Sequence, residues 1–277
     1  MSHLQTPRPQ DVAKTHEAPQ PGQHARGYHY DAPSELQDET AARSPRRIAP
    51  LLYEIFAPQR VIDVGCGLGF WLREFHRLGA AEICGLDGAW VPRERLQIPP
   101  QAFTVCDLNK ALPVTGPFDL ALCLEVAEHL RSESAERLVA SLCALSPVIV
   151  FSAAIPGQGG FEHINERFQD YWIEQFRAHG FHAHDLVRPR VWADPEVAFC
   201  YAQNLFVFVK SDAQLAPGVG ARLAAAAPPG VSLATAVHPE LYLQTLHQLS
   251  SLRGTIARVP VLISRALRRR FFPRRSD

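Results

Sequence analysis

The sequence predicts an α/β fold in which a doubly wound, seven-stranded, mostly parallel sheet carries helices on both faces. From Arg60 onward, short apolar runs of strand length alternate with amphipathic stretches of helical length, as in a parallel sheet covered by helices. The chain has 277 residues, 47% of them hydrophobic, so it can bury a substantial core. In addition, the first apolar run leads through a glycine-rich turn into a helix. We therefore expect one globular domain with irregular ends.

The expected elements follow from the spacing of apolar residues. Residues 45–56 carry apolar side chains at helical spacing, which predicts a helix ahead of the first strand. The seven expected strands cover residues 61–64, 82–86, 102–106, 118–124, 148–152, 181–187 and 205–210. Helices are expected between them at 70–75, 134–144 and 169–179.

The turn after the first strand, VIDVGCGLG over residues 61–69, is the most informative segment. Glycine has no Cβ, so a ligand can lie against bare backbone at the open end of the following helix. Dinucleotide-binding folds use G-x-G-x-x-G, whereas here Gly69 comes two places after Gly67, and Phe70 fills the position where that pattern requires a small residue. This spacing argues against a nicotinamide-dependent oxidoreductase.

Acidic residues end the next strands in order. Asp87 lies about twenty residues past the glycines, where such folds place an acid that accepts hydrogen bonds from ribose hydroxyls. Asp107 and Leu108 end the third strand, and the fourth runs from FDLALCL into EVAEHL, which begins at Glu125.

These segments together resemble the class I S-adenosylmethionine-dependent methyltransferases, in particular bacterial ones of types 11 and 23, over about residues 44–210. The resemblance implies a Rossmann-like methyltransferase fold, S-adenosylmethionine as cofactor, and an enzyme that transfers methyl groups. It places the pair Asp107 and Leu108 at the adenine. The cofactor-binding residues that it implies are Asp63, Gly65, Gly67, Gly69, Asp87, Asp107, Leu108 and Glu125.

Simpler structural roles exist for several of these residues. Asp63 and Asp87 could cap a helix or turn, and Asp119 is most simply a residue at the start of a strand. We favour ligand binding for Asp87, Asp107 and the glycines. For His129 we favour a structural role, because a histidine just after a strand usually bonds to the backbone.

The loop after the fifth strand is expected to hold the methyl acceptor, because ligands of open α/β sheets bind beyond the carboxyl ends of the strands. This loop, 153–167, is a glycine run that ends in polar side chains. We assign His163 and Glu166 to catalysis, with His163 as the general base, and Gln158 and Asn165 to acceptor binding. The opposing interpretation, equally weighted, is that His163, Asn165 and Glu166 only brace the loop.

The acceptor half of the chain resembles bacterial methyltransferases that are thought to act on sugars or cell-surface glycans. We therefore expect O-methylation of a small molecule, sugar or glycan precursor. A divalent metal shared by His163, Glu166 and a further acid is the alternative to a histidine base. No ligand spacing in the sequence supports it, so no metal is expected. The alternatives are a non-catalytic S-adenosylmethionine-binding protein and a nucleic-acid methyltransferase.

Charge argues against the nucleic-acid alternative. The formal net charge is zero, so nothing global attracts the chain to nucleic acid. The fourth strand also ends in Leu124-Glu125-Val126 and not in the Asn/Asp-Pro-Pro-aromatic segment that holds a flipped base. We expect no nucleic-acid partner.

The chain divides into three parts. Residues 1–27 are polar and are expected to form a disordered tail, 28–210 the methyltransferase domain, and 211–277 an Ala/Pro-rich linker followed by a helical, basic extension. Residues 261–277 carry six arginines among apolar groups; such a segment can lie on anionic lipid, although a solvated basic end is the simpler interpretation. Six cysteines without a C-x-x-C pair, no apolar leader and no long apolar run indicate a cytoplasmic protein, with peripheral membrane contact as the variant.

Overall fold

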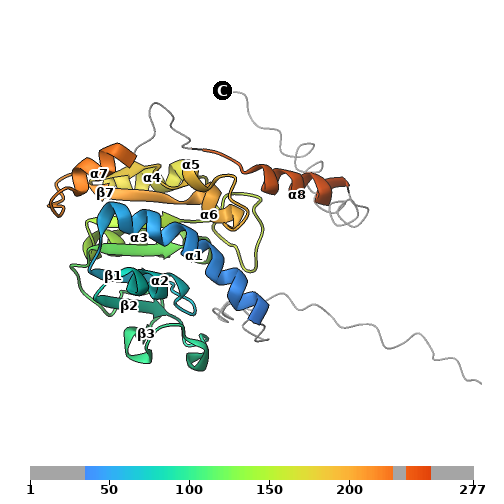
Figure 1. Ribbon diagram of the computed structural model, residues 1–277. Coiled ribbons are helices and arrows are strands. Elements are labelled where there is room, and N and C mark those ends of the chain that lie inside the picture. Colours follow the sequence, from blue (N-terminus) through green and yellow to red (C-terminus); the bar gives the residue numbers. More distant parts are fainter. Residues whose placement is uncertain (1–34, 227–234, 251–277) are drawn as a thin grey trace, which may run out of the picture.

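Seven strands form one sheet in the order β3-β2-β1-β4-β5-β7-β6 in the computed structural model, which describes residues 35–226 and 235–250 (Figure 1). The strands are β1 (Arg60–Val64), β2 (Glu82–Asp87), β3 (Phe103–Val105), β4 (Leu120–Leu124), β5 (Val148–Ser152), β6 (Phe181–His184) and β7 (Phe206–Lys210). Strands β1 to β5 pair in parallel, and β7 runs antiparallel to both β5 and β6. The expected mostly parallel seven-stranded sheet is confirmed, with strand ends shifted by up to three residues.

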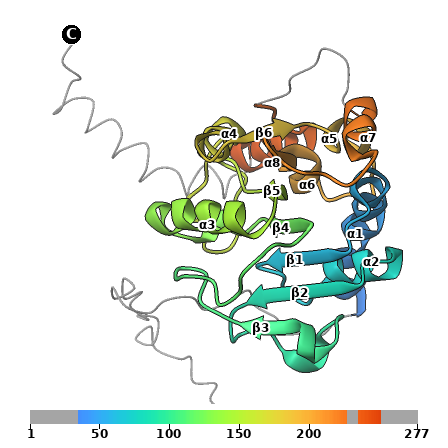
Figure 2. The same cartoon turned by 90° about the vertical axis from the view of Figure 1, so that its left-hand side faces the viewer.

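Helices cover both faces, as Figure 2 shows. Helices α1 (Glu35–Phe56), α2 (Phe70–Leu78) and α7 (Val219–Ala226) lie on one face, and α3 (Ser132–Leu145) and α4 (Gln169–Ala178) on the other. Residues of β4 alternate between the two cores: Leu120, Leu122 and Leu124 pack into the first, and Ala121 and Cys123 into the second. The sheet is therefore doubly wound, and its carboxyl edge is left to the loops.

Helix α1 is ten residues longer at its start than the pattern predicted, because it begins at Glu35 and not at Pro45. The apolar spacing that predicted the helix starts only at Ile48, so it does not reveal the turns before Pro45. The structure keeps both Pro45 and Pro50 inside the helix. Burial of its apolar face, including Ala42 and Ile48, outweighs the backbone hydrogen bonds that the prolines cannot make.

The expected linker also contains structure. Helix α7 lies within residues 211–232, and Arg222 Nε donates a hydrogen bond of 2.7 Å to the carbonyl of Ile55 at the end of α1. Val219 is buried against the core of that face. Composition alone suggested a linker because Ala, Gly and Pro are common there, but this helix docks through one buried valine and one arginine.

Short elements complete the carboxyl edge and the C-terminal part. They are η1 (Arg93–Arg95), η2 (Pro100–Ala102), η3 (Ala127–His129), α5 (Arg188–Val191), α6 (Phe199–Asn204) and α8 (Pro239–Ser250). Helix α8 projects from the body of the fold in Figure 1. The expected tail 1–27 and the basic segment 261–277 lie outside the described residues.

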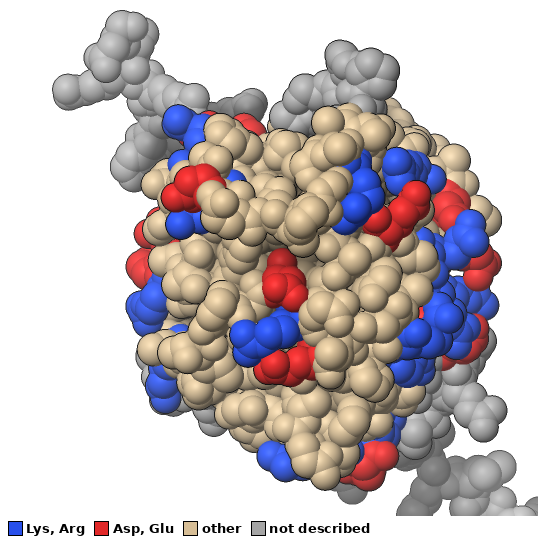
Figure 3. All heavy atoms as spheres, turned by 60° about the vertical axis from the view of Figure 1, so that its left-hand side comes forward, with Lys and Arg blue, Asp and Glu red and all other residues tan. Residues whose placement is uncertain are grey.

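The surface charges, the polarity of the helices and the state of the cysteines each bear on an expectation from the sequence. On the face in Figure 3, basic and acidic side chains are intermixed, and a broad area carries neither. Within the described ranges, the helices are too short or too polar to span a bilayer. All six cysteines are free thiols, as the absence of paired spacing predicted.

Candidate active site

The glycine turn joins β1 to α2 in the left-handed backbone conformation that glycine favours. Gly65, Gly67 and Gly69 have φ of 86°, 53° and 84°. A Cβ on Gly65 would lie 2.3 Å from Val126 Cγ2, and one on Gly69 would lie 2.9 Å from Ile98 Cγ1. These glycines therefore also let neighbouring loops pack against the turn, a packing role that the motif alone does not reveal.

Asp87 closes this turn. Its carboxylate accepts hydrogen bonds from the amides of Gly67 at 2.7 Å and Gly88 at 2.6 Å. Burial raises the pKa of Asp87, while the bonds from Gly88, Gly67 and the Trp90 side chain hold it down. The acid expected at the cofactor ribose is thus fixed by the glycine loop that it serves.

Asp63 lies beneath the turn and is 2% exposed. Its Oδ2 is buried and meets no hydrogen-bond donor in the part of the chain that the structure describes. Burial, and then the charge of Asp87, raise the pKa of Asp63 to about 7. This buried oxygen could accept a hydrogen bond from a ligand bound at the turn.

The pair Asp107 and Leu108 follows β3 as expected. Asp107 Oδ1 accepts bonds from the backbone and side-chain nitrogens of Asn109, and Lys110 Nζ lies 3.4 Å from Oδ2. The Asn109 amide is the main reason that the pKa of Asp107 is lowered. Leu108 is 8% exposed and packs into the second core.

Glu125 is the centre of a network of side-chain amides. Gln158 Nε2 donates to its Oε2 at 2.8 Å, and Asn204 Nδ2 to its Oε1 at 3.2 Å. Gln203 Nε2 in turn donates to Gln158 Oε1 at 3.2 Å. Burial raises the pKa of Glu125, but every amide around it points a donor inward, which favours the ionised form.

The backbone at Glu125 is in the left-handed region, with φ of 54°. Its amide donates to both the carbonyl oxygen and the Oγ of Ser152, at 2.9 and 3.1 Å. A non-glycine residue held in this conformation is typical of functional sites. The strain points the carboxylate of Glu125 into the amide network.

The loop between β5 and α4 is held by Glu166. Its carboxylate accepts bonds from the amides of Gly157 and Gly159, and its Oε1 lies 3.2 Å from His163 Nδ1. Donation from Nδ1 leaves the lone pair of His163 on Nε2. The two residues assigned to catalysis are therefore a carboxylate–imidazole pair.

A family model for a methyltransferase domain matches residues 28–188, more than half of the chain. The chain belongs to this methyltransferase family. It is an enzyme of the methyltransferase class, and S-adenosylmethionine is the cofactor expected for it. No curated protein matches the chain.

Similar solved structures include three methyltransferases. The methyltransferase domain of bacterial CtHen1 is 17% identical, with 62% of this chain and 98% of that chain covered and a TM-score of 0.46. Magnesium protoporphyrin IX methyltransferase from Synechocystis with bound SAM is 18% identical, with coverage of 64% and 81% and a TM-score of 0.46. An S-adenosylmethionine-dependent methyltransferase from Mesorhizobium loti is 22% identical, with coverage of 61% and 94% and a TM-score of 0.43.

The residues of this methyltransferase fit the cofactor. Asp63 offers a buried oxygen without a donor, the positive-φ glycines expose backbone, and Asp87 lies beside both. The cofactor carries an ammonium and ribose hydroxyls, which are donors that such oxygens accept. Asp63, the glycines, Asp87 and Glu125 lie at the carboxyl ends of β1, β2 and β4, and the pair Asp107 and Leu108 follows β3. The individual contacts of these residues with the cofactor stay predictions.

Asn165 has structural partners within the loop. Its Oδ1 accepts bonds from Ser132 Oγ and Arg167 Nε, both at 3.0 Å, and its backbone N–H donates to the carbonyl of Glu128. It is 4% exposed. These contacts are those of a residue that braces the loop, as the alternative interpretation described; acceptor binding by Asn165 stays a prediction.

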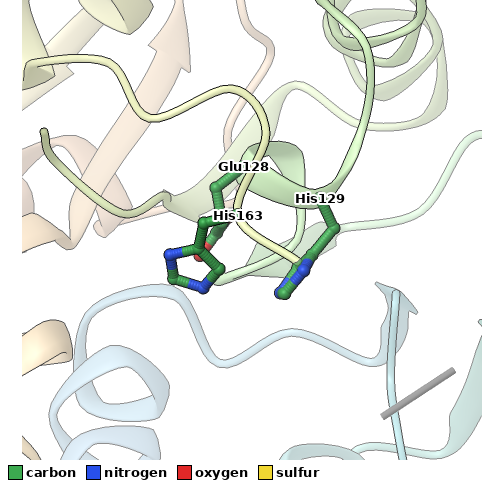
Figure 4. A group of neighbouring side chains, drawn as sticks. All are labelled: Glu128, His129 and His163. Atoms are coloured by element: carbon green, nitrogen blue, oxygen red, sulfur yellow. The ribbon is translucent and has the colours of Figure 1, made fainter. Parts of the chain in front are cut away.

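Sequence reasoning missed one group in the methyltransferase. Glu128 and His129 on η3 and His163 on the loop after β5 bring one potential ligand atom each to within 4.8 Å of one another (Figure 4). The rings of His129 and His163 meet edge to face with centroids 4.8 Å apart. This geometry brings His129 beside two further potential metal ligands, whereas the sequence pointed to a structural His129 and to no metal; both expectations stay predictions.

The electrostatics of this group are unusual. Burial, and then the charge of Glu125, raise the pKa of Glu128 well above its ordinary value. Burial, and then the nearby His163, lower the pKa of His129, while hydrogen bonds to the carbonyls of Glu162 and Phe161 raise it in part. Glu128 and His129 are thus both biased towards their neutral forms.

Proposed function

We propose that this methyltransferase transfers the methyl group of S-adenosylmethionine to a hydroxyl of a small molecule, sugar or glycan precursor. The observation that carries the proposal is the His163–Glu166 pair, held on the loop after β5 beside Glu125 and η3. Methyl transfer is an in-line displacement, so the protein must align the acceptor and deal with its proton. An imidazole oriented by a carboxylate is suited to hold an acceptor hydroxyl.

Exposed apolar side chains on the same loop support an acceptor with some apolar surface. Phe161 is 48% exposed, Ile164 64% and Phe168 43%. They flank His163 in sequence, whereas the amides of Gln158 and Gln203 are occupied by Glu125 and its network. We therefore place acceptor contacts on the 161–168 segment and revise the direct acceptor role of Gln158.

Cofactor binding is the first test. We expect calorimetric titration to show one S-adenosylmethionine per chain, no binding of NAD, and a loss of at least about tenfold in affinity for Asp87→Ala, because a charge-assisted hydrogen bond to the ribose is worth about 1.5–3 kcal/mol. The matched control is Asp212→Ala, an exposed aspartate just after β7 and away from the glycine turn, which should keep wild-type affinity.

The outcomes separate the alternatives. Binding of S-adenosylmethionine with no methylation of any hydroxyl-bearing acceptor in a screen of sugars, nucleotide sugars and phenols would favour a cofactor-binding protein without O-methyltransferase activity. Equal affinity of wild type and Asp87→Ala would remove Asp87 from the cofactor site.

A further inference from the structure

The side chains of Glu128, His129 and His163 come from two segments and form a cluster whose potential ligand atoms lie within 4.8 Å of one another. Glu128 and His129 are adjacent on η3, whereas His163 belongs to the loop that follows β5 (Figure 4). The two segments are joined by backbone bonds, because the amides of Ile164 and Asn165 donate to the carbonyl of Glu128 at 2.9 and 3.0 Å. The cluster is therefore a fixed feature of the fold and not a chance encounter of mobile side chains.

Glu128 is the strongest sign that the cluster binds a ligand. The residue is 0% exposed, and no side chain among the described residues donates to its carboxylate; only the backbone of Glu128 and Ala154 lowers its pKa. A buried carboxylate without a partner is costly, so folded proteins either protonate it or place a cation against it. No lysine or arginine is paired with it in the described ranges, and its nearest titratable neighbours include two imidazoles.

Both histidines are oriented as metal ligands are. His163 Nδ1 faces Glu166 Oε1 at 3.2 Å, and the His129 ring is hydrogen-bonded to the backbone of Glu162 and Phe161. Metal-bound histidines nearly always donate their second nitrogen to a carboxylate or a carbonyl, which fixes the ring and the tautomer. Donation from Nδ1 leaves Nε2 of His163 for a ligand, and the backbone bonds fix the plane of the His129 ring.

We infer that Glu128, His129 and His163 bind a divalent transition-metal ion, such as Mn²⁺, Co²⁺ or Zn²⁺. Two imidazole nitrogens and one carboxylate favour these ions over Mg²⁺ and Ca²⁺, which prefer oxygen ligands. Glu166 holds His163 from outside the ligand set, and Glu125 adds a further negative charge close to Glu128. Three protein ligands leave coordination positions open.

The use of the ion rests on the proposed function. An acceptor hydroxyl bound at an open position becomes more acidic and loses its proton to solvent. Its oxygen then forms a bond to the methyl carbon while the carbon–sulfur bond breaks and the electron pair of that bond stays on sulfur. In this scheme His163 is a metal ligand, and the ion takes over the activation that was first assigned to His163 as a base.

The test measures metal binding without turnover. Metal-free full-length protein is titrated with Co²⁺, followed by visible absorption, and with Mn²⁺, followed by calorimetry. We expect wild type to bind one ion that Glu128→Gln, His129→Ala and His163→Ala each lose, with affinity lowered at least about tenfold. The matched control is His182→Ala on β6, an exposed histidine outside the cluster, which keeps the ion.

Folding and the proposed function are checked separately. Circular dichroism establishes that each variant is folded, and the ion should raise the melting temperature of wild type and of His182→Ala but not of the three ligand variants. Titration with S-adenosylmethionine should give wild-type affinity in His163→Ala. Equal metal binding by wild type and all three ligand variants would overturn the metal inference even if the cofactor binds. If wild type does not bind S-adenosylmethionine, the proposed function is overturned and the metal result still stands.

Discussion

At the scale of single residues, the site is built from carboxylates that folding alone would not place there. Asp63 Oδ2 and both oxygens of Glu128 are buried without side-chain donors in the described part of the chain. A carboxylate in such surroundings destabilises the folded protein when ionised. A ligand that donates to Asp63, and the proposed cation beside Glu128, would each offset this cost.

Asp63 gives a prediction about stability and pH. The pKa of about 7 in the folded protein lies above the ordinary value of 3.8, so between these values the folded state holds a proton that the unfolded state has released. Stability without cofactor should therefore fall as pH rises from about 4 to about 7 and stay level with respect to this group above that. We expect Asp63→Asn to flatten this decline and raise the melting temperature at pH 8 by about 2–4 °C for each kcal/mol recovered.

The measurement is thermal unfolding followed by circular dichroism from pH 5 to pH 8. Asp119→Asn serves as the control, because Asp119 lies on the surface and Asp63 is intact in that variant, so the wild-type decline should persist. A decline of equal steepness in Asp63→Asn would show that other groups cause it.

The sequence revealed some of these residues and not others. Asp63, the glycines and Asp87 are close in the chain or follow strand ends, so local spacing was enough to predict them. Glu128, His129 and His163 are different, because His163 reaches the others only through the path of the loop after β5. Such a path depends on Glu166 and the Gly157 and Gly159 amides, and no periodicity encodes it.

At the scale of elements, periodicity predicted the sheet well but missed the first ten residues of α1 and the presence of α7. Alternating apolar runs define β1 to β7 because strands buried on both faces need continuous apolar residues. The start of α1 and the presence of α7 depend instead on tertiary contacts that override proline and composition. The contact between these two helices supplies the prediction at this scale.

Arg222→Ala should destabilise the fold. The variant removes the bond from Arg222 Nε to the carbonyl of Ile55, and a hydrogen bond from a charged group is worth about 1.5–3 kcal/mol. Urea unfolding measures the change. Gly220→Ala is the matched control on the same helix, since a Cβ there meets nothing within 4 Å, and it should stabilise by about 0.5–1 kcal/mol. No effect of either variant would return residues 219–226 to the status of a linker.

At the scale of the whole molecule, charge is balanced and intermixed. The chain has 28 basic and 28 acidic residues, and the face in Figure 3 shows both kinds interspersed. Nucleic-acid affinity depends mainly on clustered cations that release counterions. This balance favours small acceptors over a polyanion.

We therefore expect the full chain to retain neither duplex nor single-stranded DNA or RNA in gel-shift experiments at 150 mM salt. A version without residues 261–277, which hold six of the arginines, separates the domain from the basic segment. Retention that persists after this deletion, with a steep dependence on salt, would favour the nucleic-acid alternative.

The amide network around Glu125 has a direction. The amide of His238, just before α8, donates to Gln203 Oε1 at 2.8 Å; Gln203 donates to Gln158, and Gln158 donates to Glu125. Each primary amide has one accepting and one donating end, so reversing any of them breaks two bonds at once. Because the Glu125 carboxylate can only accept, it fixes the orientation of Gln158 and Gln203, and this chain of hydrogen bonds ends at the backbone before α8. A methyl acceptor that broke the hydrogen bond from Gln158 to Glu125 would therefore also disturb the bonds of Gln203 and of the His238 amide, which immediately precedes α8.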